Sequence, residues 1–182
     1  DPAVRMAIIS AYRSAGDKPA LIAIAGNSAA PVEVRSSAIS NLSGLAAPAD
    51  LWTLYQKETN ADLKIRMISA FSSMRAVEQL SQIARTEKDP AVRQRAIRAL
   101  GGQKSEQTGQ MLVDIYSTNQ DNDVRKAVIS ALSAQNNAEG LIAIARKEGS
   151  MELKRDIVAR LSNLATNGKN KAAEAYLMEI IK

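Results

Sequence analysis

Apolar residues recur along this chain at helical spacing, and the pattern returns about every thirty residues. The clearest stretch is DPAVRQRAIRAL, at positions 89–100. Its apolar positions are Val92, Ala96, Ile97 and Leu100. Residues three and four apart lie on one side of an α-helix, whereas a strand would alternate. The stretch therefore predicts an amphipathic helix.

Six copies of this stretch align on one basic residue each, which we call the anchor. The anchors are Arg5, Arg35, Lys64, Arg93, Arg125 and Lys154. The steps between them are 30, 29, 29, 32 and 29 residues, and such a fixed period is typical of a stacked repeat array. Five copies begin with a residue that can cap a helix, namely Asp1, Asn60, Asp89, Asp121 and Ser150, and only Pro31 departs.

A second apolar segment follows each anchor helix after a turn. Its centre is a pair of apolar residues three apart: Leu21/Ile24, Leu51/Leu54, Leu80/Ile83, Leu112/Ile115, Leu141/Ile144 and Leu177/Ile180. We expect residues 101–107 to form a long turn that accounts for the 32-residue step. Neither helix can bury its apolar stripe alone, so successive helical hairpins must stack.

The D-P-x-V-R opening, the A-I-x-A-L first helix and the L-I-A-I-A second helix resemble short bacterial HEAT-like repeats, also called the phycobilisome-lyase type. The resemblance covers all six copies and implies an all-α, right-handed α-solenoid (α-α superhelix, HEAT/ARM-like) of six helical hairpins. It also implies that second helices line the concave side. We expect one HEAT-like domain over 1–182, with repeats at 1–30, 31–59, 60–88, 89–120, 121–149 and 150–182.

The composition restricts the chemistry that this chain can perform. It contains no Cys and no His, which removes thiol nucleophiles, imidazole bases and the usual zinc ligands. We therefore expect no enzyme, no cofactor and no metal. No apolar run approaches a membrane span, and the compartment, cytoplasmic or periplasmic, stays open. Because the chain opens on a helix cap without Met, we expect a fragment of a longer protein.

The net charge of +5 and the pI near 9.6 raise the alternative of a nucleic-acid-binding protein. However, anchors in HEAT-like arrays are expected to pair with the cap Asp of their own or a neighbouring repeat. Without the six anchors and the three cap Asp residues, 18 basic and 16 acidic residues remain, a net charge of +2. This balance favours a solvated surface over a phosphate-binding face.

The sequence thus favours a protein- or peptide-binding scaffold that presents its second helices. The candidate partner-binding residues are Trp52, Tyr55, Arg85, Val113 and Arg146. Trp52 and Val113 share a mostly apolar column one position after the central Leu, and the alternative use of that column is packing between second helices. Arg85 and Arg146 share another column, which suits a helix C-terminus or the rim of a groove.

The sequence leaves two other functions open, and its last helix suggests a contact outside the six hairpins. A nucleic-acid-binding HEAT-like domain, similar to the HEAT-like alkylpurine DNA glycosylases, predicts DNA affinity that falls steeply with salt. A phycobilin lyase-like accessory protein predicts bound bilin. The last helix has an apolar side that includes Tyr176, Met178 and Ile181, and we expect either a missing continuation of the array or an end-to-end contact with another molecule.

Overall fold

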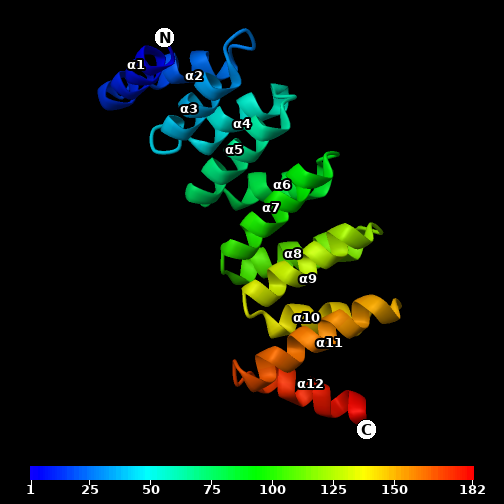
Figure 1. Ribbon diagram of the computed structural model, residues 1–182. Helices are drawn as coiled ribbons and strands as arrows, with labels where there is room; N and C mark the ends of the chain where they lie inside the picture. The colour runs from blue at the N-terminus through cyan, green and yellow to red at the C-terminus, as the bar shows by residue number, and fades with distance from the viewer. The chain divides into compact units, whose positions relative to one another are not determined.

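The computed structural model describes residues 1–182 as twelve α-helices without strands (Figure 1). The helices are α1 (Pro2–Ala15), α2 (Lys18–Gly26), α3 (Val32–Leu42), α4 (Pro48–Lys57), α5 (Ala61–Ser73), α6 (Val77–Thr86), α7 (Pro90–Gly102), α8 (Glu106–Thr118), α9 (Asn122–Ala134), α10 (Ala138–Ala145), α11 (Met151–Thr166) and α12 (Lys171–Ile181). Odd-numbered helices are the first helices of the hairpins and even-numbered ones the second. The predicted all-α chain of helical hairpins is confirmed, and its handedness stays a prediction.

The chain divides into two compact units, Asp1–Leu80 and Ser81–Lys182. The first unit contains α1 to α5 and the start of α6, and the second contains the rest of α6 and α7 to α12. The division lies inside α6, in the third repeat. A single domain over 1–182 therefore stays a prediction, and each unit is described by itself.

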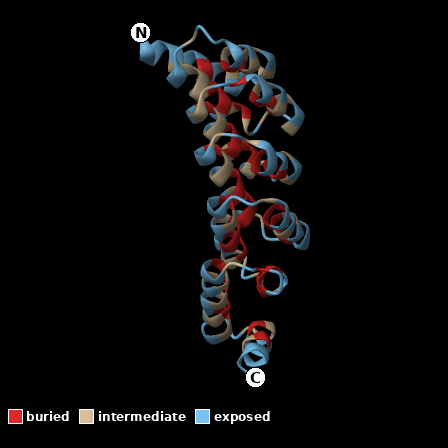
Figure 2. Ribbon diagram, turned by 90° about the vertical axis from the view of Figure 1, so that its right-hand side faces the viewer, coloured by how far each residue is buried: buried red, intermediate tan, exposed pale blue.

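The first unit is held together by the apolar stripes of its helices. The helix α3 packs on α1, α2 and α5, while α4 packs on α2 and α5. On α3 the fully buried residues are Ala38, Ile39 and Leu42, which are the stripe positions that follow the anchor Arg35. Buried segments lie where helices face one another, and the exposed segments lie outside (Figure 2). The repeat pattern thus identifies the core of this unit.

In the second unit, first helices pack on first helices and second helices pack on second helices. The first helices α7, α9 and α11 pack in succession, and so do the second helices α8, α10 and α12. The helices α7 and α9 approach so closely that a Cβ atom on Gly101 would lie 2.9 Å from Cβ of Ala131. Small residues therefore set the spacing between these two first helices.

Side-chain caps begin the helices as the sequence predicts. The side chains of Asp1, Asn60, Asp89, Asp121 and Ser150 each accept a backbone N–H of the helix that follows, and Pro31 provides no such bond. The second helices have caps that the sequence analysis did not predict: Asp17, Ser105, Asn137 and Asn170. Each cap satisfies N–H groups that have no partner within the helix.

The predicted long turn over residues 101–107 is wrong. The helix α7 continues through Gly102, and α8 begins at Glu106 after only three connecting residues. Gly101 is buried against α9 instead of turning the chain, and Ser105 caps α8 by accepting the N–H of Thr108 at 3.1 Å. The helix α7 has 13 residues, as do α5 and α9, whereas α8 has 13 residues against 10 in α6, so the three additional residues of this repeat lengthen its second helix.

Candidate partner-binding surface

Each unit has its own candidate surface, the outward side of its second helices, which we call the second-helix face of that unit. Three ion pairs on this face link one second helix to the next within a unit. Lys18 pairs with Asp50 at 3.0 Å in the first unit, and in the second unit Arg85 pairs with Asp114 at 3.8 Å and Arg146 with Glu179 at 2.9 Å. The hydrogen bond from Lys18 lowers the pKa of the Asp50 carboxyl. Because solvent reaches all three pairs, each contributes little to the stability of the fold.

The two predicted arginines therefore lie on the second-helix face, but each already has an acidic neighbour. The side chain of Arg85 is 37% exposed and that of Arg146 is 58% exposed. The guanidinium of Arg146 also lies over the ring of Tyr176, 5.7 Å from its centroid. Both arginines remain accessible to a partner, which would have to compete with these intramolecular contacts.

The two predicted aromatic residues of α4 stack on one another in the first unit. The rings of Trp52 and Tyr55 are 5.4 Å apart and almost parallel, at 4°. Phe71 of α5 packs 6.2 Å from each ring. Tyr55 is only 6% exposed, whereas Trp52 is partly exposed. Tyr55 thus supports Trp52 from the core, and Trp52 is the member of the cluster that solvent reaches.

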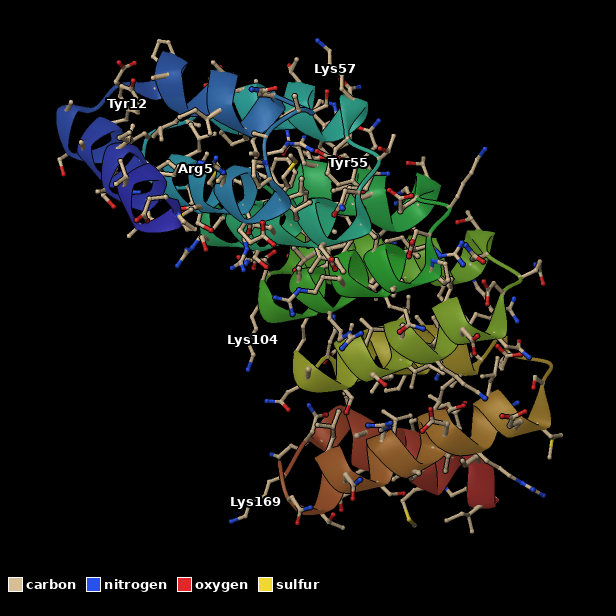
Figure 3. All side chains as sticks on the ribbon, turned by 45° about the horizontal axis from the view of Figure 1, so that its top comes forward. Arg5, Tyr12, Tyr55, Lys57, Lys104 and Lys169 are labelled. Atoms are coloured by element: carbon tan, nitrogen blue, oxygen red, sulfur yellow. The ribbon has the colours of Figure 1, made fainter.

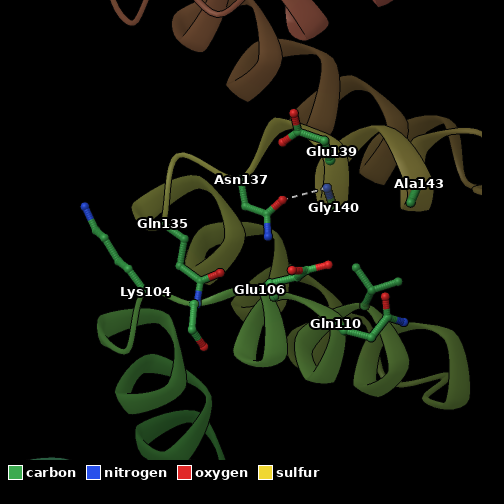
Figure 4. Close-up of a pocket in the computed structure, with 11 residues that line it drawn as sticks. Lys104, Glu106, Gln110, Gln135, Asn137, Glu139, Gly140 and Ala143 are labelled. Atoms are coloured by element: carbon green, nitrogen blue, oxygen red, sulfur yellow. Dashed lines mark hydrogen bonds between the residues drawn. The ribbon is translucent and has the colours of Figure 1, made fainter.

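The fifth predicted residue, Val113, lies in the wall of a hollow between α8 and α10 (Figure 4). The hollow has a volume of about 610 Å³, which is in the range of pockets that hold small ligands or side chains. Its lining comprises Lys104, Ser105, Glu106, Gly109, Gln110, Val113, Gln135, Asn137, Glu139, Gly140 and Ala143. The structure thus brings Val113 to a recess and not to a flat contact between helices.

Two glycines in the lining, one on each helix, leave room for the side chain of Asn137. A Cβ atom on Gly109 would lie 2.3 Å from Nδ2 of Asn137, and one on Gly140 would lie 3.0 Å from its Oδ1. Asn137 occupies this space because its Oδ1 caps α10, accepting the N–H of Gly140 at 2.8 Å (Figure 4). Larger residues at either glycine would displace that cap and fill the recess.

The charges around the hollow are two carboxylates and one ammonium group. Glu106 begins α8 and Glu139 lies in the first turn of α10, and both are exposed. Lys104 extends from the turn before α8 away from the ribbon (Figure 3), and its ammonium group points away from Glu106 and Gln110 (Figure 4). The net charge of the lining is therefore −1.

Buried charges hold the ends of the second helices. In the second unit the Tyr116 hydroxyl donates to Oε2 of Glu148, and Arg125 lies 3.6 Å from the same oxygen. Burial works to raise the pKa of Glu148, but the bonds from Tyr116 and from the N–H of Ser150, together with Arg125, lower it overall. Burial and the Glu148 carboxylate raise the pKa of Tyr116. The group favours an ionised glutamate beside a neutral tyrosine.

The anchors only partly follow the expected pairing. Arg93 pairs with the cap Asp121 of the next repeat at 2.5 Å, as predicted. Arg35 and Arg125 instead pair with Glu58 and Glu148, at the ends of the second helices of their own hairpins.

These two glutamates were not predicted from the sequence, although their spacing marks them. Each stands 23 positions after its anchor, and Glu87 occupies the same position after Lys64. The oxygens of Glu58 and Glu148 also accept backbone N–H groups of the link to the next repeat. The same side chain thus binds the anchor and closes the connection between hairpins.

The last helix exposes part of its apolar side. Met178 is 57% and Ile181 is 78% exposed. Tyr176, which was expected on the same exposed side, is buried at 4%, since it points toward α10 and lies under Arg146. An end-to-end contact through α12 stays a prediction.

The structure brings no three metal-binding side chains together. None of its helices combines the length and the apolar character that crossing a bilayer requires.

Within each unit, stacked helical hairpins that bury one stripe per helix define an α-solenoid type of repeat protein. Residues 49–133 match the family model for HEAT repeats. This match supports a HEAT-like repeat protein, and HEAT repeats are commonly protein-interaction scaffolds. The comparison with curated proteins finds no match.

Proposed function

We propose that this chain is a non-enzymatic scaffold that binds a protein or peptide partner on its second-helix face. The observation that carries the proposal is the hollow between α8 and α10, where Val113 and Ala143 offer apolar surface beside polar groups. Recesses that combine apolar walls with a few polar groups are the usual sites of side-chain recognition. In this proposal Trp52 belongs to the second-helix face of the first unit, and the arginines Arg85 and Arg146 belong to that of the second unit.

The electrostatics weigh against nucleic acid as the partner. The anchors Arg35, Arg93 and Arg125 are engaged with carboxylates, so they are not free to neutralise phosphates. Glu106 and Glu139 at the hollow would repel a phosphate backbone. The positive net charge of the chain is therefore a poor guide to its partner.

Site-specific photo-crosslinking tests the proposal. Ala143 on α10 is exposed on the second-helix face, and Ser130 on α9 is an exposed control on a first helix. Each is replaced by p-benzoylphenylalanine, and the protein is irradiated in the cells that produce it. We expect a discrete adduct from position 143, absent from position 130 and lost when Val113→Asp is added to a variant that keeps its helical circular dichroism. Identical adducts from both positions, or none from 143, would overturn the proposal.

A further inference from the structure

We infer that the hollow between α8 and α10 takes an arginine side chain of a polypeptide partner. This inference rests on the proposed function and adds the chemistry of the group that is recognised. It depends on the hydrogen-bonding state of the lining, on its unpaired charges and on its shape.

The first observation is an acceptor that has no donor. The amide nitrogen of Gln135 donates to the carbonyls of Leu100 and Gln103, at 3.1 and 3.2 Å, and to the Thr108 hydroxyl at 3.1 Å. Because the two carbonyls can only accept, they fix which end of the amide is the nitrogen. The Oε1 atom therefore faces Gly109 and Asn137, and it is buried without any hydrogen bond (Figure 4). A buried acceptor of this kind lowers stability until a donor reaches it.

The second observation is that the carboxylates at the hollow are unpaired. Elsewhere on this face Asp114 and Glu179 are each matched with an arginine. Glu106 and Glu139 form no ion pair, although they stand on the two helices that flank the recess. The hollow thus presents two unpaired carboxylates, with the unsatisfied oxygen of Gln135 just beneath its surface and the ammonium group of Lys104 turned away, and this arrangement suits a cationic ligand with several N–H donors. A guanidinium has five donors in a planar fork, more than an ammonium group offers.

The third observation is the apolar part of the lining. Val113, Ala143 and the two glycines contribute carbon surface beside the polar groups. The methylene stem of an arginine can lie along such surface while its charged end reaches carboxylates. An inorganic cation would use the carboxylates alone and leave this surface bare. The Nδ2 group of Asn137 adds a donor that suits a peptide carbonyl next to the arginine.

The test uses two capped peptides that differ only in charge. Ac-GSRSG-amide is titrated into the ¹⁵N-labelled chain, and the comparison peptide has citrulline, the neutral isostere, in place of arginine. We expect the backbone amide signals of Gly109 and Gly140 to shift with the arginine peptide and to stay in place with the citrulline peptide. Added salt should weaken the effect, since the carboxylates are exposed.

Substitutions assign the effect to the two carboxylates. The double variant Glu106→Gln/Glu139→Gln should weaken the arginine peptide about fivefold, the loss expected for two exposed charge pairs. Glu33→Gln is the matched control, since Glu33 is also an exposed acid in the first turn of a helix, α3 of the other unit, and it should change nothing. Equal shifts with citrulline, no shift at the two glycines, or full binding by the double variant would overturn the inference. If the double variant loses no affinity for the arginine peptide but keeps the crosslink from position 143, the inferred arginine site is wrong and the proposed scaffold function is still supported.

Discussion

The Tyr116 hydroxyl makes the clearest stabilising contact between two second helices of the second unit. It stands on α8 and donates to Glu148, which follows α10. Tyr116 is 4% and Glu148 is 8% exposed, so water cannot readily replace the donor. The substitution Tyr116→Phe removes this hydroxyl and keeps the packed ring.

The loss of stability caused by Tyr116→Phe depends on the contacts that the Glu148 carboxylate retains. The carboxylate keeps the N–H of Ser150 at 2.7 Å and Arg125 at 3.6 Å. A hydrogen bond to a charged group contributes about 1.5–3 kcal/mol, and the retained partners favour the lower half of that range. We expect a loss of about 2 kcal/mol in the free energy of unfolding, or about 4–8 °C in Tm for a chain of this size.

Urea unfolding followed by circular dichroism measures this loss, and Tyr176→Phe is its control. Tyr176 is also 4% exposed, it belongs to the same unit, and its hydroxyl makes no hydrogen bond. We expect Tyr176→Phe to change the free energy of unfolding by less than about 0.5 kcal/mol. If the two variants lost the same stability, the contact with Glu148 would not be the cause and the reasoning would be refuted.

Three further predictions concern close packing, a turn and pH. Gly101→Ala should cost about 1–3 kcal/mol because its Cβ would lie 3.0 Å from Cα of Ala131. Gly102→Ala, with nothing within 4 Å, should gain about 0.5 kcal/mol, and equal urea midpoints would disprove the close approach. Gly16→Ala should cost about 1 kcal/mol, measured by thermal unfolding, since Gly16 has φ of 68° and free space around it. Folding raises the pKa of Tyr116 above its ordinary value of 10.0. The stability that this shift contributes is therefore fully present below pH 10.0 and decreases as the pH rises toward the pKa of the folded state. Tm measured across that range should therefore fall more in the parent than in Tyr116→Phe, and parallel curves would contradict the assignment.

The first helices could be predicted from the sequence because their determinants are local. A cap residue, an anchor and four stripe positions lie within about twelve residues of one another, and Asp89 and Asp121 cap their helices as expected. The burial of Ile97 and Leu100 follows from helical periodicity alone. Local patterns of this kind do not depend on how hairpins meet.

The candidate surface was less predictable, because it depends on contacts between repeats. The repeat position that Trp52 and Val113 share identifies a helix face. It does not predict that Tyr55 is buried and stacks on Trp52. The hollow requires Gly109 and Gly140 to meet around Asn137, and these residues are separated by a whole repeat. Only the stacked arrangement of α8 and α10 reveals such a recess.

The internal use of basic residues changes what the charge of this chain implies. Its pI near 9.6 suggests an anionic partner, yet the anchors Arg35 and Arg125 lie against buried glutamates and contribute little to the outer field. On the second-helix face, Arg85 and Arg146 are likewise matched with carboxylates. At the hollow, Glu106 and Glu139 have no such partner, and the lining carries a net charge of −1. The basic residues that join the hairpins thus do not set the sign of the charge at the proposed partner site. Local pairing, and not net charge, should therefore guide the choice of partner to test.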